Sequence, residues 1–214
     1  MSWGSTRPPY HDSGLKRLFD LATSGSLLLA LSPLMLGIAI VVRAVMGAPV
    51  LFVQERVGRG GVPFRLYKFR TMRPGDGRAP QITARGDWRV TPLGRFLRAT
   101  KMDELPQLAN VWRGEMSIVG PRPEVPTYVQ HYTPVQRGVL AARPGLTDPA
   151  SIRFRDEESL LARAAPERRA AVYVEEIMPQ KLAMSLDYVA RSGFWLDLRL
   201  ILETAAALLR PNGR

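Results

Sequence analysis

Two adjacent carboxylates, Asp103 and Glu104, are the side chains that most invite a chemical role, because they stand in a chain whose formal net charge is +11. They lie in the stretch TKMDELPQL, from Thr100 to Leu108. Adjacent residues point about 100° apart on a helix and to opposite sides of a strand. The pair therefore does not suit a glycosidase, in which two carboxylates flank one bond roughly 5 to 10 Å apart.

Three uses of the acidic pair remain. A carboxylate can cap a helix, which is the commonest role of such residues. Carboxylate oxygens also suit Mg²⁺, which keeps several waters and bridges to substrate phosphates. A carboxylate can also attack phosphorus and form an acyl phosphate, and at an unperturbed pKa of about 3.9 Asp103 is ionised without a general base. The sequence alone leaves these three uses open.

Attack of a carboxylate on a phosphate requires cations that offset the repulsion between the two anions. The candidates are Arg98, Lys101, Arg122, Lys68 and Arg70. Lys68 and Arg70 alternate along a predicted strand and so share one face, which is either solvated or a phosphate contact. Arg122 stands between two prolines in Gly120-Pro121-Arg122-Pro123, which restrict the backbone and fix where this side chain points.

The composition bounds the classes of partner. A chain of 214 residues with 46% hydrophobic content favours one globular core. Thirty Lys and Arg against nineteen Asp and Glu attract polyanions such as nucleic acid, anionic lipid or phosphorylated substrates. The absence of cysteine excludes disulfides and thiolate chemistry, and two histidines argue against a multi-histidine metal site.

An apolar run from Leu21 to Val42 contains no charged residue and is long enough to cross a bilayer, for which about 20 residues suffice. Lys16-Arg17 precede it and Arg43 follows it, so the positive-inside rule draws both ends to the cytoplasmic side. Ser32-Pro33, near the middle, removes a helix hydrogen bond. The run is therefore either a kinked spanning helix or a helix-break-helix that enters and returns on one side.

The rest of the chain predicts short elements. A strand, a turn and a second strand are expected through VLFVQERV, GRGG and VPFRLYKFRTM, followed by a loop at 73–88 without assigned chemistry. A helix is expected from Thr91-Pro92, with Leu93, Phe96 and Leu97 on its buried side, and a second helix from Leu105 to Trp112. Further along, we expect a turn at Pro144-Gly145, a strand at SIRFR, and a helix from Glu167 to Ala190 that is interrupted at Pro179. The acidic pair then falls at or just before a helix N-terminus, where the helix dipole favours negative charge.

The C-terminal segment GFWLDLRLILETAAALLR carries one apolar stripe at helical spacing. Its members are Phe194, Trp195, Leu198, Ile201, Leu202, Ala205, Leu208 and Leu209. Such a stripe suits a core helix or a helix at a bilayer surface, and the apolar run at 21–42 favours the second.

Five landmarks occur in a fixed order along the chain: KRLFD before a Ser-Pro-bearing apolar helix, KFRTM, DELPQL, SIVGPRP and RPGLT. With them the sequence resembles the bacterial sugar transferases known as small monotopic phosphoglycosyl transferases, from about Lys16 to Arg210. The resemblance implies that Asp103, with Mg²⁺ bound, attacks the β-phosphate of a UDP-sugar, releases UMP and becomes a phosphosugar ester. A polyprenol phosphate, undecaprenyl phosphate, then takes up the sugar phosphate. Glu104 matches the second member of the family's acidic dyad.

The resemblance also implies where substrates and metal bind. Metal is expected at Asp103 and Glu104, and substrate at Arg98, Arg122, Pro123, Lys68, Arg70 and Arg155. The chain departs from many members after PGLT, where it reads DPASIRFRDEE, so Arg155 rests on spacing alone. The partners implied are the UDP-sugar, the polyprenol phosphate, the bilayer and downstream glycosyltransferases, with a homodimer left open and no nucleic acid.

The expected fold class is α+β and mainly helical. The resemblance implies that its N-terminal membrane helix, broken at Ser32 and Pro33, is re-entrant, and we expect a small β-hairpin or sheet and surrounding amphipathic interfacial helices. The expected organisation is a polar segment at 1–14, the re-entrant helix at 15–46 and a membrane-associated catalytic domain at 47–214, on the cytoplasmic face of a bacterial inner membrane.

Two other classes explain part of the sequence. A nucleic-acid-binding protein accounts for the charge but gives no reason for the apolar run. A non-catalytic membrane scaffold accounts for the run and the C-terminal stripe, and leaves the acidic pair as helix caps.

Overall fold

The structure is a computed structural model that describes residues 9–73 and 86–209. Most of the loop expected at 73–88 and of the polar N-terminal segment lies outside these residues. Along the described chain the elements are η1 (Tyr10–Asp12), α1 (Gly14–Met46), β1 (Leu51–Val57), η2 (Arg59–Gly61), β2 (Pro63–Phe69), α2 (Pro92–Ala99), η3 (Met102–Glu104), α3 (Gln107–Arg113), β3 (Ser117–Val119), α4 (Pro126–Val129), η4 (Gln136–Ala141), β4 (Gly145–Thr147), α5 (Pro149–Arg153), α6 (Glu157–Ala162), η5 (Pro166–Arg168), α7 (Arg169–Val172), the π-helical η6 (Tyr173–Ile177), α8 (Met178–Arg191) and α9 (Phe194–Leu209). The fold is thus mainly helical with small sheets, as the sequence predicts.

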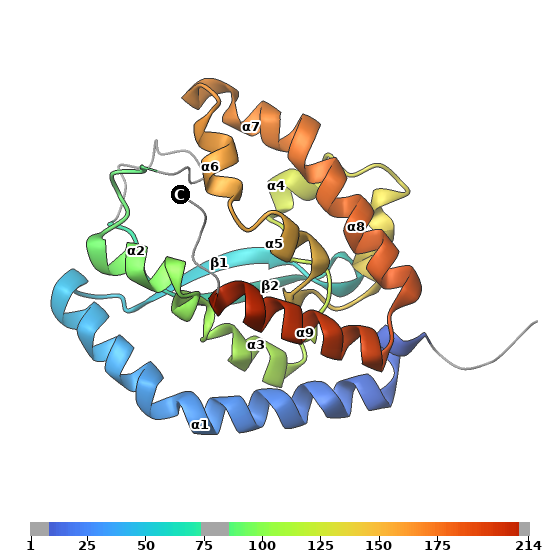
Figure 1. The fold of residues 1–214 in the computed structure, drawn as a ribbon, viewed down its shortest axis with the longest axis horizontal. Helices are drawn as coiled ribbons and strands as arrows, with labels where there is room; N and C mark the ends of the chain where they lie inside the picture. The colour runs from blue at the N-terminus through green and yellow to red at the C-terminus, as the bar shows by residue number, and fades with distance from the viewer. Residues whose placement is uncertain (1–8, 74–85, 210–214) are drawn as a thin grey trace, which may run out of the picture.

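Helix α1 is one long apolar helix that bends along its length and runs outside the rest of the molecule (Figure 1). The expected break is a bend in a continuous helix. Pro33 has no N–H for the carbonyl of Leu29, and the hydroxyl of Ser32 donates to that carbonyl instead, at 2.8 Å. Because the side chain satisfies the group that proline leaves free, the helix continues through Pro33.

The two predicted strands form an antiparallel hairpin, with Leu51 paired to Phe69 and Val57 to Pro63. A second, parallel pair joins β3 to β4, with Ser117 opposite Gly145. Gly145 therefore begins a strand where a turn was expected.

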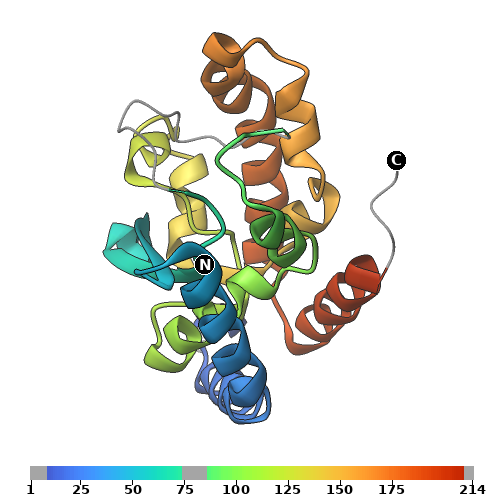
Figure 2. The same ribbon diagram turned by 90° about the vertical axis from the view of Figure 1, so that its left-hand side faces the viewer.

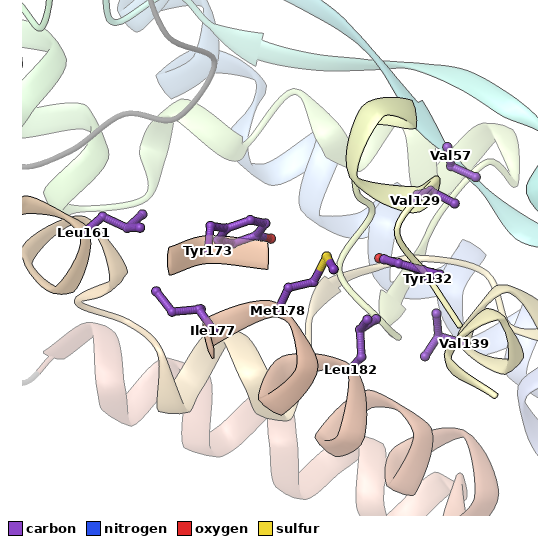
Figure 3. Close-up of a cluster of buried hydrophobic side chains, with 9 residues drawn as sticks. All are labelled: Val57, Val129, Tyr132, Val139, Leu161, Tyr173, Ile177, Met178 and Leu182. Atoms are coloured by element: carbon purple, nitrogen blue, oxygen red, sulfur yellow. The ribbon is translucent and has the colours of Figure 1, made fainter. Parts of the chain in front are cut away.

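Three hydrophobic clusters hold the elements together. The first lies between α8, η6, α4 and β1 and includes Tyr132, Tyr173 and Leu182 (Figure 3). The second joins β2, α3, β3, α8 and α9 to the first half of α1. The third packs Leu97 of α2 on Ile38 and Val42 in the second half of α1. Both halves of α1 therefore contact the body.

Three local predictions are wrong. Phe96 is 57% exposed, because the buried side of α2 is formed by Leu97 and Gly94. The segment read as a strand, SIRFR, mostly falls in helix α5, which Asp148 caps through the N–H of Ser151. The expected interruption at Pro179 is a π-helical segment that ends just before it.

Helix α9 exposes much of its apolar stripe, although Ile201 packs on the second cluster. Trp195 is 77% exposed and Leu202 is 62% exposed, whereas Asp197 and Leu200 on the other side are buried. Figure 2 shows α9 standing at the edge of the molecule. The exposed part of the stripe is therefore not a core-facing side of α9, and an exposed apolar stripe is typical of an interaction surface.

A buried ionic cluster connects α1 to α9. Lys16 Nζ lies 2.6 Å from Asp197 of α9 and 3.2 Å from Asp20, one turn along α1. Asp20 also accepts hydrogen bonds from the hydroxyl of Ser117 and the N–H of Ile118 in β3, both at 3.0 Å. Lys16 is 2% exposed, so this cation holds the protein together instead of facing lipid head groups.

We predict that replacing Lys16 by Met destabilises the protein by about 3–5 kcal/mol, because two buried carboxylates then lose their counter-charge. At about 2–4 °C per kcal/mol, the midpoint of thermal unfolding in detergent micelles should fall by roughly 10 °C or more.

The matched control is Arg199→Gln, which removes an exposed pair with Glu203 on α9. Its midpoint should stay within about 2 °C of the wild type. Equal, small shifts for both variants would contradict a structural role for Lys16.

Candidate active site

The acidic pair lies in η3, the short turn between α2 and α3 (Figure 1). Asp103 is 6% exposed and Glu104 is 8% exposed. No side chain caps η3 or α3. The helix-capping use of the pair is therefore not the one the structure adopts.

Glu104 is held by two cations from different parts of the chain. Lys68 Nζ of β2 lies 3.2 Å from Glu104 Oε1, and Arg122 Nη2 lies 2.8 Å from the same oxygen. Burial by itself would raise the pKa of Glu104, but the charges of Arg122 and Lys68 outweigh it and hold that pKa well below its usual value. Glu104 is therefore a fixed anion that positions Lys68 and Arg122.

Arg122 is positioned by backbone contacts that the sequence only partly predicts. Its N–H donates to the carboxylate of Asp148 at 2.7 Å, and Asp148 is 1% exposed. A Cβ on Gly145 would lie 2.1 Å from the backbone nitrogen of Gly120, so the loop that carries Arg122 crosses β4 too closely for a side chain. The predicted strand at 151–155 gives Asp148 no role, although Asp followed by Pro is an N-cap signal that identifies it.

Asp103, in contrast, keeps an oxygen without a partner. Its Oδ1 is buried and accepts no hydrogen bond within the described residues. Burial, and next the negative charge of Glu104, raise the pKa of Asp103 to about 6. Asp103 in the free protein therefore loses its proton near pH 6 and not near 3.9, the value expected from the sequence. A buried, unpartnered and basic carboxylate is suited to nucleophilic attack or to binding a cation.

The donor set bears on the expected Mg²⁺. Both oxygens of Glu104 face cations, at 2.8 and 3.2 Å for one and 3.4 Å for the other. Across residues 9–73 and 86–209, no group of three or more Asp, Glu, His or Cys side chains gathers as a metal site. Asp103 Oδ1 is the oxygen that fits the ion, with other ligands from substrate phosphates and water. The fit is thus to Asp103 more than to Glu104.

The other residues expected at the site are spread over a wider region. Arg98 donates to the hydroxyl of Thr71 at 3.1 Å and pairs with Glu158 at 2.7 Å, and its charge acts on Asp103. The carbonyl of Pro123 accepts a hydrogen bond from Arg56. Arg155 lies in the turn between α5 and α6.

Arg70 is not brought to the acidic pair. Its guanidinium donates to the carbonyls of Met46, Gly47 and Ala48, at the C-terminal end of α1. Arg70 follows the last residue of β2, so the strand alternation that groups it with Lys68 no longer applies there.

The site lies directly against α1. Met102 and Leu105, on either side of the pair, pack on the cluster formed by Ile38 and Val42 of α1. Helix α1 is long and apolar enough to cross a membrane by length and composition, and few of its apolar side chains are buried. The acidic pair is thus placed where an apolar helix meets a cationic site.

This combination defines a protein with a long apolar helix and a buried acidic dyad surrounded by cations. The family model of bacterial sugar transferases matches residues 11–211, and the chain belongs to that family.

Similar proteins act on several sugars. A UDP-glucose:undecaprenyl-phosphate glucose-1-phosphate transferase of Caulobacter vibrioides is 38% identical over 201 residues, which cover 92% of this chain and 70% of that protein. The uncharacterized sugar transferase EpsL of Bacillus subtilis is 38% identical, over 93% of this chain and 89% of its own length. A UDP-N-acetylgalactosamine-undecaprenyl-phosphate N-acetylgalactosaminephosphotransferase of Aeromonas hydrophila is 31% identical, and this chain spans 47% of it.

We predict that Asp103→Asn stabilises the protein above pH 6. The pKa of Asp103 rises from 3.8 to about 6 on folding, so the folded state binds the proton more tightly and loses stability as pH rises between these values. The neutral amide removes this loss, which is at most about 3 kcal/mol.

Thermal unfolding measured from pH 4 to pH 8 should show the gain of Asp103→Asn growing up to about pH 6 and then staying level. The control is Asp187→Asn, at a half-exposed carboxylate on α8 paired with Arg191. A gain of the same size and pH dependence in both variants would contradict the burial of a costly charge at Asp103.

Proposed function

We propose that this protein transfers a sugar 1-phosphate from a UDP-sugar to undecaprenyl phosphate and thereby starts assembly of a glycoconjugate. The observation that carries the proposal is the buried, unpartnered oxygen of Asp103 beside a dyad partner already neutralised by Lys68 and Arg122. The names of the relatives from Caulobacter vibrioides and Aeromonas hydrophila supply the class of donor and acceptor.

In the first step, an oxygen of Asp103 forms a bond to the β-phosphorus of the UDP-sugar. The bond from this phosphorus to the bridging oxygen breaks, and the bridging oxygen leaves with its electron pair as part of UMP. Asp103 then carries the sugar phosphate as an acyl phosphate.

In the second step, an oxygen of undecaprenyl phosphate attacks the same phosphorus. The bond from phosphorus to Asp103 breaks, the carboxylate is restored, and the product is an undecaprenyl diphosphate sugar. Both nucleophiles are anions, so neither step needs a general base, provided that Asp103 has lost its proton.

The surrounding cations supply what the chemistry requires. Lys68 and Arg122, held in place by Glu104, and Arg98 beside Asp103 would bind the phosphoryl oxygens as charge develops on them. Mg²⁺ held by Asp103 and the diphosphate would neutralise the charge that otherwise repels the carboxylate. Pro123 would keep the loop that carries Arg122 rigid, and Arg155 remains a substrate contact proposed from spacing.

We infer further that α1 enters the membrane and returns to the cytoplasmic face. Its two ends are tied to one β-hairpin: Asp12, just before α1, pairs with Arg59 in the hairpin turn, and Arg70 after β2 binds the carbonyls at the other end of α1. A helix of 33 residues is about 50 Å long, so a span would place these ends on opposite sides of the bilayer. The middle of α1 around Pro33, where several leucines are exposed, would be the part immersed in lipid.

A membrane scaffold with a non-catalytic acidic pair is the rival explanation. It accounts for α1 and for the exposed stripe of α9, but it gives no reason for a buried carboxylate oxygen left without a partner. A nucleic-acid-binding role explains neither feature.

We predict that Asp103→Asn lowers the rate of UMP release from UDP-sugars by at least about 10³-fold, because the covalent nucleophile is lost and only positioning remains. UMP should be measured across a panel of UDP-sugars, with and without Mg²⁺ and undecaprenyl phosphate. Asp187→Asn serves as the matched control and should keep wild-type activity. Unchanged UMP release in Asp103→Asn would end the catalytic assignment.

The topology predicts that both ends of α1 are reached from the same side. The chain has no cysteine, so Asp12→Cys and Val62→Cys can each be labelled with a membrane-impermeant maleimide in oriented vesicles. We expect both positions to react in inside-out vesicles and to be protected in right-side-out vesicles. Labelling of Asp12→Cys from the opposite side to Val62→Cys would show a spanning helix.

A further inference from the structure

Lys101, two residues before Asp103, has an unusual backbone. Its φ is 58° and its ψ is 14°. Among the described residues that are not glycine, Lys101 alone has a positive φ. A side chain in this left-handed region costs about 1–2 kcal/mol. The carbonyl of Lys101 accepts the N–H of Glu104 at 3.1 Å, which joins the strained residue to the dyad.

The side chain of Lys101 is exposed at the edge of the dyad. Its charge lowers the pKa of both Asp103 and Glu104, although burial dominates at Asp103, so the ammonium is within electrostatic reach of both carboxylates. No described carboxylate lies within salt-bridge distance of it. In contrast, Lys68 and Arg122 are partly buried and already paired with Glu104. Lys101 is therefore an exposed cation without a described carboxylate partner, and it is accessible to an anion that is not part of the protein.

An exposed stripe on α2 adjoins Lys101. Pro92, Arg95, Phe96 and Ala99 follow the i, i+3, i+4, i+7 spacing of one helix face, and all four are exposed. The opposite face of α2 carries Leu97, which is 1% exposed and packs on Ile38 and Val42 of α1. The stripe thus presents an aromatic ring and a guanidinium on the exposed face of α2, and Lys101 follows two residues after the last residue of this helix.

We propose that Arg95, Phe96 and Lys101 form the docking surface for the acceptor, an isoprenoid phosphate. Lys101 and Arg95 would bind its phosphate, and Phe96 would contact the first isoprene units. The surface matches a ligand with an anionic head and an apolar tail. This inference rests on the proposed function and assigns the second of its two steps to a surface separate from Lys68 and Arg122.

The test separates the two steps. UMP release without acceptor measures the first step, and the acceptor KM measures the second, both at pH 8 so that Asp103 is deprotonated in every variant. Lys101→Asn removes the charge while keeping a residue that tolerates positive φ. We expect UMP release within 3-fold of wild type and an acceptor KM raised at least 10-fold, with Lys101→Arg restoring most of the loss.

Phe96→Ala separates the tail from the head of the acceptor. It should raise KM for undecaprenyl phosphate and leave KM for a phosphate monoester without an isoprene unit, such as methyl phosphate, unchanged. Arg137→Asn, which removes an exposed cation on η4, should leave both steps unchanged.

Three results would overturn the docking surface. They are an unchanged acceptor KM in Lys101→Asn, a loss confined to UMP release, or a loss that Lys101→Arg does not restore. If Asp103→Asn released UMP at the wild-type rate, the proposed function itself would fail, and this outcome does not depend on Lys101.

Discussion

The buried cation Lys16 fixes the position of helix α1 relative to helix α9, and the rest of the structure depends on this arrangement. It lies between Asp20 on α1 and Asp197 on α9, out of contact with water. Tyr188 of α8 donates to the same Asp197 at 2.7 Å. Because a buried charge without its partners is strongly unfavourable, these contacts hold together or fail together. The long apolar helix α1 and helix α9, whose apolar stripe is exposed, are thereby fixed to one core.

The same contacts reach the site through one strand. Asp20 accepts the N–H of Ile118 in β3, and the chain then passes through the close crossing at Gly120 to Arg122, which binds Glu104. The second half of α1 meets the site from the other side, through Met102. Both halves of the apolar helix are therefore connected to the dyad through packed residues, and the position of the dyad relative to α1 is a property of the packed protein.

Local signals in the sequence predicted what depends on neighbouring residues. The hairpin, the Thr91 cap of α2 and the position of the acidic pair at a helix start follow from spacing and capping rules, and the structure confirms them. Lys68 and Arg122 were selected as cations, and both reach Glu104. Arg70 was assigned to the same strand face although it lies beyond the strand. The Lys16 cluster joins residues far apart in the chain, which no local pattern reveals.

The hairpin of β1 and β2 also connects the two ends of the bent helix α1. The hairpin is shorter than the helix that it connects. Each of its strands has seven residues, about 23 Å, whereas α1 is about 50 Å long. A straight helix that crosses a bilayer adjusts its tilt to the thickness of the hydrocarbon layer. On the proposed topology, both ends of α1 are fixed to the hairpin, so the protein determines how far the middle of α1 reaches into the bilayer. The enzyme should therefore lie at the same depth in thick and in thin membranes.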